Sequence, residues 1–329
     1  MGTGTYTFGG VPGSKGNRED LLDFITNISP RETPLLSSIE TTEANDVTHE
    51  WLTDSLPATS TAGAGEGFEF ASAALTARTR VKNWTQIFQL PVKVSNSQRA
   101  ANVAGVDDEY KYQIMKNAAA LIRNVERRIF SPSGSHKSAT AEGGARLMKT
   151  LSDLISKRSS LRGSALNGVG SATASSTVIT EKRFNNALQR AFENGGKPDV
   201  FHCNAAAARQ VMAFTGYGNA RRNIAAADRR LVAAVEVYES QFGIVEVILN
   251  RWIRMPSNHT AAISTGTYGQ VYWLERSQIR LAVYRPFDHV PLAPNGDATR
   301  GYVMGEVTLE IGDPSSCYRA WGVKNIVLS

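Results

Sequence analysis

The run from Leu75 to Ser95 constrains the fold more than any other segment, because its polar–apolar alternation changes phase midway. In the first part, one phase carries the charged residues Arg78, Arg80 and Lys82. Farther along, the same phase carries Trp84, Phe88, Leu90, Val92 and Val94. Alternation decides which face of a strand is buried, so the buried face swaps. The pattern fits either an ordinary twisted, bulged strand or a strand that leaves its own domain and crosses a neighbour.

The residues before this run predict a large hairpin and an arm. Strand character begins at Val47, reaches Pro57, and gives way to the small-residue stretch ATSTAGAGEG, from which the later run returns. This order indicates a hairpin with a flexible tip. Residues 1–18 are rich in Gly and Ser and predict a flexible arm. A short helix follows from Asn17 to Ser29-Pro30, with an apolar stripe of Leu21, Leu22, Ile25 and Ile28.

A long amphipathic helix is predicted over about 107–130. Its apolar side carries Ile114, Ala118, Leu121, Val125 and Ile129, and its opposite side carries Lys116, Arg123 and Arg127. Acidic residues 107–109 suit the positive N-terminal end of a helix, and Ser131-Pro132 marks the stop. Such a helix is roughly 36 Å long, which is long enough to serve as the backbone of a domain.

The remainder of the chain alternates helix and strand. We expect helices at 144–160, 181–194 and from Asn204 to about 214, a surface loop at 163–176, and a strand at 199–203. Further strands are expected at 233–239, 244–250, 260–264, 270–274 and 278–285. Residues 286–298, rich in Pro, Asn and Gly, are expected to separate these from a final antiparallel pair, 300–311 and 316–328, joined by a turn at 312–315.

Composition excludes several classes of protein. The 329 residues are 42% hydrophobic and 20% charged, which is typical of one large or two ordinary folded domains. Two cysteines without CxxC spacing exclude a disulfide framework and indicate a reducing compartment. No apolar stretch is long enough for a membrane span, and the N-terminal residues lack a secretory pattern. A net charge of +6 permits an acidic partner such as nucleic acid without requiring one.

The sequence offers no catalytic constellation. The five histidines (His49, His136, His202, His259 and His289) are scattered and none has metal-ligand spacing with another. Adjacent His202 and Cys203 would point to opposite faces of a strand. Neither a nucleophile elbow, a phosphate-binding loop nor a dinucleotide fingerprint is present. We therefore expect no enzyme activity, no catalytic residue, no metal site and no cofactor.

A basic cluster is the other feature with two interpretations. Arg221, Arg222, Arg229 and Arg230 lie within ten residues. Contact with nucleic-acid phosphates would need no base-specific residues. A solvated or inter-subunit charged face is the favoured interpretation, since no interleaved aromatics or recognisable nucleic-acid module accompany the cluster. The cluster is therefore a candidate DNA-facing or inter-subunit surface.

Three stretches of the sequence carry a resemblance to a known family. The first is NREDLLDFITNISPRETPLLSSI followed by HEWLTDSL, and the second is ARTRVKNWTQIFQLPVKVS followed closely by the long helix. The third is GEVTLEIG near the C-terminal end. Together they resemble the major capsid proteins of tailed bacteriophages, which have the HK97-type fold. The likeness runs from about Asn17 to Ser329 and consists of diffuse similarities in the right order and spacing, not of a catalytic signature.

The resemblance implies an α+β fold with four parts. These would be an N-terminal arm (1–47), an extended β-hairpin loop (48–95), a peripheral domain on the long spine helix (96–146 and 290–329), and an axial domain (147–289). It also implies a structural protein that self-assembles as hexamers and pentamers into an icosahedral phage head around double-stranded DNA. Implied partners are other copies of the chain and portal, scaffold and decoration proteins, with non-specific contact to packaged DNA and no membrane. The location would be the virion, after assembly in the host cytoplasm.

In such proteins each extended loop lies over an adjacent subunit, which would explain the phase change. Aromatic and Arg side chains anchor interfaces, so we expect inter-subunit contacts from Arg78, Arg80, Lys82, Trp84 and Phe88. Some family members cross-link a Lys to an Asn, but no Asn or catalytic acid of this chain matches that chemistry. The alternative functions are a non-capsid nucleic-acid-binding protein that uses the basic cluster, and an enzyme on an unfamiliar fold.

Overall fold

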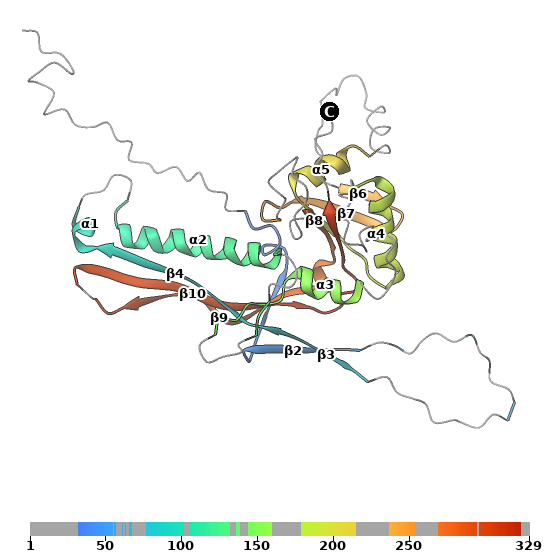
Figure 1. Ribbon diagram of the computed structural model, residues 1–329, viewed down its shortest axis with the longest axis horizontal. Helices are drawn as coiled ribbons and strands as arrows, with labels where there is room; N and C mark the ends of the chain where they lie inside the picture. The colour runs from blue at the N-terminus through green and yellow to red at the C-terminus, as the bar shows by residue number, and fades with distance from the viewer. Residues whose placement is uncertain are drawn as a thin grey trace, which may run out of the picture.

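The computed structural model describes residues 32–54, 77–101, 106–131, 136–138, 144–159, 179–214, 237–253, 269–294 and 296–323, with Leu56, Thr61, Gly63, Glu66 and Gly67. Strands in this part of the chain form three separate sheets, of which the two larger ones lie side by side (Figure 1). None of the described helices is long and apolar enough to cross a membrane.

The first sheet has four strands in the order β1-β9-β10-β4. Its central ladder is formed by β9 (Ile279–Leu292) and β10 (Ala298–Ile311), which run antiparallel. One edge is β4 (Gln86–Ser95), antiparallel to β10, and the other is the short β1 (Glu40–Glu43), parallel to β9. The long helix α2 (Glu109–Ile129) lies along one face of this sheet, and the short α1 (Asn96–Ala100) precedes it (Figure 1).

The helix α2 forms where the sequence predicts it. The side chain of Asp108 accepts a hydrogen bond from the Tyr110 backbone N–H and caps the first turn. The predicted apolar side is confirmed at Leu121, Val125 and Ile129, which are each at most 1% exposed. The helix thus binds the sheet through a conventional apolar stripe, and its acidic start complements the helix dipole.

The second sheet has five strands in the order β11-β8-β5-β7-β6. They are β5 (Val200–Cys203), β6 (Val237–Ser240), β7 (Gly243–Leu249), β8 (Gly269–Leu274) and β11 (Tyr318–Val323). Helices α4 (Glu181–Glu193) and α5 (Ala205–Met212) pack on it, capped by Thr180 and Asn204 respectively. Its core is aromatic: the ring of Phe184 makes edge contacts with Phe201 at 5.0 Å and Trp273 at 5.4 Å between centroids.

The third sheet is the hairpin of β2 (Thr48–Thr53) and β3 (Thr79–Trp84). The phase change predicted for the returning run is confirmed. Up to Thr85 the buried positions are odd-numbered (Asn83 and Thr85), whereas from Phe88 onward they are even-numbered (Phe88, Val92 and Val94). The change occurs where the chain passes from the two-stranded sheet into β4 of the four-stranded sheet, so each half of the run buries a different face.

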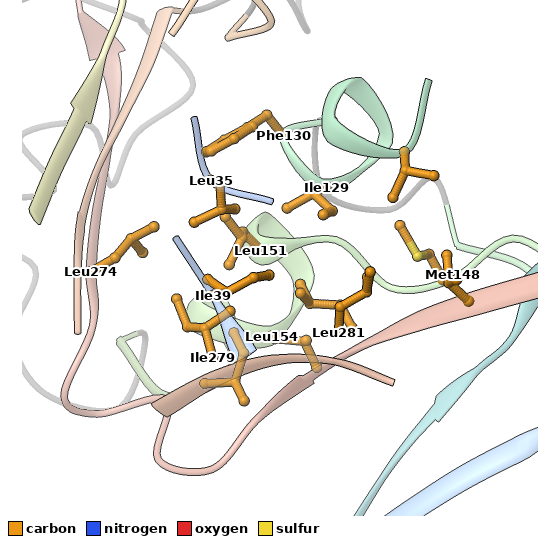
Figure 2. Close-up of a cluster of buried hydrophobic side chains, with 14 of the residues drawn as sticks. Leu35, Ile39, Ile129, Phe130, Met148, Leu151, Leu154, Leu274, Ile279 and Leu281 are labelled. Carbon is orange, nitrogen blue, oxygen red and sulfur yellow. The ribbon is translucent and has the colours of Figure 1, made fainter. Parts of the chain in front are cut away.

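One apolar core joins the two larger sheets (Figure 2). It takes Leu274 from β8, Ile279 and Leu281 from β9, Ile129 from α2, and Leu151 and Leu154 from α3 (Leu151–Ser159). The N-terminal segment contributes Leu35, which is 0% exposed, and Ile39. Because β8 continues into β9 within this core, the two sheets share their packing.

Two expectations for the C-terminal third are wrong. Residues 286–292 do not separate strands but continue β9. Proline is tolerated there because Pro286 falls at a register shift in the β9–β10 ladder, and Pro291 lies beyond the short β1, where β9 is an edge. The predicted pair 300–311 and 316–328 does not form either, because β10 pairs with β9 and β4 whereas β11 pairs with β8.

The turn between β10 and β11 is present, but it does not return the chain to β10. Gln278 holds it from outside: the backbone N–H of Gly312 donates to its carbonyl oxygen at 2.8 Å and that of Asp313 to its Oε1 at 3.2 Å. The chain is thereby directed toward the second sheet. The helix expected at 144–160 begins at Leu151. The expected helix at 17–28, loop at 163–176 and strand at 260–264 lie outside the described residues.

The division into four parts stays a prediction, and the sheets show where it would need adjustment. The run 48–95 contributes β4 to the four-stranded sheet, and β9 extends across residue 290. β11, from the C-terminal segment, belongs to the five-stranded sheet.

The substitution Leu121→Ala is expected to lower the free energy of unfolding by about 3 kcal/mol, because it leaves a cavity between α2 and the sheet. Leu121 is 1% exposed. Urea unfolding followed by circular dichroism measures the change. The matched control is Asn124→Ala on the exposed side of the same helix, which should change the midpoint little; equal midpoints for both variants would contradict this packing.

Candidate assembly surface

The hairpin β2–β3 projects from the body (Figure 1), with one face (Glu50, Leu52, Arg80 and Lys82) exposed and the other (Trp51 and Val81) half-buried. Its strands pair in register from Thr48 opposite Trp84 to Thr53 opposite Thr79. Leu52 is 59% exposed near its outer end. An isolated two-stranded hairpin is marginally stable in water, so an exposed one that is part of a folded chain favours a contact with another molecule.

Three of the predicted contact residues lie on this hairpin with accessible charges. Arg78 pairs with Asp54 at 3.4 Å and Arg80 with Glu50 at 3.3 Å, and both guanidinium side chains are 70% exposed. Exposed pairs of this kind contribute little to stability. Lys82 is also exposed. The charges are therefore available to a partner without disruption of the fold.

The other two predicted residues are placed differently. Trp84 is half-buried: its ring stacks on His136 with centroids 5.9 Å apart, and the Lys149 ammonium group lies 4.9 Å from its centroid. Phe88 is only 7% exposed and belongs to the core beneath α2. Its side chain is engaged within its own chain, so the predicted inter-subunit contact rests on the remaining four residues.

The root of the hairpin is fixed to β10 by polar contacts. The Trp51 indole N–H donates to the carbonyl oxygen of Ile311 at 2.9 Å, and His49 Nε2 lies 3.0 Å from Glu310 Oε2. Asn83, which is 0% exposed, donates through Nδ2 to the Leu309 carbonyl oxygen at 2.7 Å. Its Oδ1 accepts from the Lys149 backbone N–H at 2.7 Å. These contacts fix the hairpin at one end while the other end extends outward.

A buried ionic junction lies at the point where the phase changes. Glu306 of β10 is 1% exposed and accepts hydrogen bonds from Thr85 Oγ1 and an Arg146 guanidinium N–H, each at 2.5 Å. Arg285 donates to its other oxygen at 2.9 Å. Arg146 also donates to the Thr85 carbonyl oxygen at 3.2 Å. The junction thus ties the end of the hairpin to β9, to β10 and to the segment before α3.

The surroundings of Glu306 favour its ionised form. Burial by itself would raise the pKa of this carboxyl, but the hydrogen bonds from Thr85, Arg285 and Arg146 and the charge of Arg146 outweigh it. The pKa of Glu306 is therefore lowered from its usual value. Since a carboxylate held between two guanidinium groups has few alternative geometries, the junction constrains the direction in which the hairpin leaves the sheet.

The face of the four-stranded sheet opposite α2 carries exposed apolar side chains. Val92 and Val94 of β4 pack against α2, so the alternate residues of that strand face the other way. That face includes Ile87 at 45% and Leu292 at 44% exposed. Tyr302 and Met304, both half-buried, lie between them in the paired register. Within the described residues this face has no helix over it. Its exposed apolar side chains lie among the polar and charged residues Gln89, Lys93, Asp288 and Arg300, a mixture that suits contact with another protein surface.

Within the residues that the structure describes, the histidine and cysteine side chains are not gathered into one site. Burial lowers the pKa of His202 to about 3 and raises that of Cys203 to about 12, so both are uncharged at neutral pH. His49, His136 and His289 lie at separate places beside Glu310, Trp84 and Tyr110, and His259 is outside the described residues. No group of three His, Cys, Asp or Glu side chains in the described part of the chain could hold a metal ion.

Sequence reasoning missed the residues that hold the hairpin. Glu306, Thr308 and Glu310 alternate with apolar residues, a pattern that predicts a solvent-facing side, yet they are 1%, 0% and 8% exposed. The hairpin root and Arg146 cover that side. Glu306 follows the run GYVMG at 301–305, and a charged residue directly after that run was the signal in the sequence that could have indicated the junction. The basic cluster Arg221, Arg222, Arg229 and Arg230 lies outside the described residues and stays a prediction.

Comparisons with known proteins agree with this architecture. The family model of the SU10 major capsid protein matches residues 3–324. A search of curated protein sequences finds no match. The solved capsid of a native GTA particle superposes with a TM-score of 0.63 at 12% identity, over 97% of this chain and 100% of that one.

Two further structures show the same arrangement. One from Microbacterium phage Oxtober96 gives a TM-score of 0.55 at 13% identity, over 94% of this chain and 96% of that one. The holo-SrpI encapsulin complex from Synechococcus elongatus PCC 7942 gives 0.53 at 10% identity, over 94% of both chains. At these identities the likeness establishes the fold, which is of the HK97 type. With the family match over nearly the whole length, the chain belongs to the SU10 major capsid protein family and is a structural subunit of a viral capsid.

Proposed function

We propose that this chain forms hexamers and pentamers that close into an icosahedral phage head around double-stranded DNA. The observation that carries the proposal is the hairpin β2–β3, which is fixed at its root and exposed along the face that carries Glu50, Leu52, Arg80 and Lys82. One chain that makes heterologous contacts can close rings around more than one kind of axis. The hairpin would extend each contact past the compact body and so enlarge the buried area.

The surface that receives the hairpin is the apolar sheet face opposite α2. Ile87, Tyr302, Met304 and Leu292 on that face would cover the apolar part of a neighbour's hairpin, including Leu52. Arg78, Arg80 and Lys82 would then lie at the rim of the contact and set its register, since rim charges act on specificity and rate more than on affinity. Trp84 would border the contact from the hairpin root.

We assign the two larger sheets to different parts of such a shell subunit. The four-stranded sheet with α2 would be the core of the peripheral domain, and the five-stranded sheet that of the axial domain, near the symmetry axes. Portal, scaffold and decoration proteins are further proposed partners, with assembly in the host cytoplasm. Contact with packaged DNA would be non-specific and governed by phosphate charge. Arg221–Arg230 is a candidate for that contact or for one between subunits.

Deletion of residues 58–74, the hairpin tip, is expected to leave a folded subunit that assembles poorly, because the neighbour loses the outer part of the contact. Electron microscopy of the purified full chain should show shells or hexameric rings, and the deletion variant should show mostly small species. Circular dichroism and thermal unfolding control for folding. Normal shells from a folded deletion variant would rule out the proposed role of the hairpin.

Exchange of the charges of the Arg80–Glu50 pair shows whether Arg80 acts within its own hairpin or in a contact between subunits. Arg80→Glu is expected to reduce the yield of shells by removing a rim contact. The double variant Arg80→Glu with Glu50→Arg restores the internal 3.3 Å pair but not the outward charge pattern, so the yield should stay low. Light scattering during assembly measures the yield. Full recovery in the double variant would mean that Arg80 acts only within its own hairpin.

Replacement of Glu306 by Gln is expected to lower the free energy of unfolding by about 2 kcal/mol at pH 7, because charged hydrogen bonds from two arginines are lost. The lowered folded-state pKa means that Glu306 stabilises the fold above the ordinary value of 4.5, and that this stabilisation is lost as pH falls through the folded-state pKa. Urea unfolding at several pH values should show this acid-dependent loss in the wild type and less of it in the variant. Glu50→Gln is the exposed control, and equal behaviour of both variants would contradict a structural role for the junction.

A further inference from the structure

One stripe of side chains along α2 is buried near the C-terminal end of the helix and exposed toward its N-terminal end. Met115, Ala119, Ile122 and Glu126 follow helical spacing and share a face. Glu126 is 0% exposed, whereas Met115 is 66% and Ile122 is 43% exposed. Two large apolar side chains that continue a buried stripe indicate a contact surface.

The buried end of this stripe is covered by the root of the N-terminal arm. Backbone N–H groups of Leu35 and Leu36 each donate to a different oxygen of Glu126 at 3.0 Å. Asn250 Nδ2 donates to the same carboxylate at 2.7 Å. The arm root therefore already lies on this face of α2, fixed by three donors to one buried acid.

The arm continues from its root toward the exposed part of the stripe. The Trp252 indole N–H donates to the carbonyl oxygen of Glu32 at 2.7 Å, and the Arg123 guanidinium lies 5.8 Å from the Trp252 ring centre. From Leu36 back to Glu32 the chain thus moves from Glu126 toward Arg123, in the direction of the N-terminal end of α2.

The sequence of the preceding segment matches the exposed face in length and in chemistry. Residues 17–28 would make about 18 Å of helix, and the stretch of α2 from Lys111 to Ile122, also twelve residues, has the same length. The segment has the apolar residues Leu21, Leu22, Ile25 and Ile28, with the acids Glu19, Asp20 and Asp23 beside them. The α2 face has Met115 and Ile122, with Lys111, Lys116 and Arg123 at its borders. Apolar surface and opposite charges are therefore complementary.

We propose that residues Asn17–Ile28 bind as an amphipathic helix on the Met115–Ile122 face of α2 in their own chain. The contact covers both exposed apolar residues and places Asp20 near Lys116. It makes the arm an integral layer of the subunit over α2, separate from the hairpin contact on the other side of the sheet. The proposal concerns the single chain and holds whether or not the shell has the proposed hexamers and pentamers.

Engineered cysteine pairs test the contact in the full-length chain. Ile28→Cys with Ile122→Cys, and Leu21→Cys with Met115→Cys, share one helix register and should each form an intrachain disulfide under oxidation by copper–phenanthroline and oxygen. The product migrates faster on a non-reducing gel and reverts with dithiothreitol. Native Cys203 and Cys317 are buried and do not compete. Ile28→Cys with Asn124→Cys is the matched control, because Asn124 is exposed on another side of α2.

Charge exchange provides a second, independent readout. Asp20→Lys should lower the yield of the Ile28–Ile122 cross-link, and the addition of Lys116→Glu should restore it. Absence of a cross-link from both matched pairs, or equal yield from the Asn124 control, would overturn the proposal. Interchain dimers in place of the intrachain product would overturn it as well, since they would show that the arm binds the α2 face of a second copy.

Discussion

The carboxylate of Glu306, held between Arg146 and Arg285, is the interaction on which the hairpin depends. A cluster of two positive charges and one buried negative charge is stable only when its geometry is good and nearly all of its hydrogen bonds are made. Thr85 supplies the remaining donor at the residue where the strand changes its buried face. The junction therefore converts one continuous strand into two segments with different roles: β4 in the sheet core and β3 in a projecting hairpin.

The elements that the sequence predicts well are those with one strong periodic signal. The helix α2 has a clear apolar stripe and acidic cap, and the phase change before Phe88 marks a real transfer between sheets. The pairing of β11 could not be predicted, because a turn specifies local geometry and not the sheet that the next strand joins. The burial of Glu306, Thr308 and Glu310 depends on segments more than 150 residues distant in sequence, such as Arg146 and His49, so strand alternation alone assigns them to solvent.

The two faces of the four-stranded sheet have different roles: one packs within the subunit, and the other is available for contact with another molecule. The face beneath α2 is closed by conventional packing of Leu121, Val125 and Val303. The other face keeps Ile87 and Leu292 partly exposed, beside a hairpin that exposes Leu52. Sequence reasoning identified the hairpin charges but not the surface that would receive them, because an apolar residue on an outward face looks the same in sequence as one in a core.

The pairing of early and late segments also has a consequence for when the subunit becomes competent to assemble. β1 pairs with β9 in the register Glu40 to Arg280, and the hairpin root binds β10 through Leu309 and Ile311. Contacts of such long sequence separation form late, and during synthesis they cannot form until the final strands have left the ribosome. A nascent chain therefore has a hairpin without a fixed direction. Completion of translation would act as a checkpoint that keeps unfinished chains out of the growing lattice.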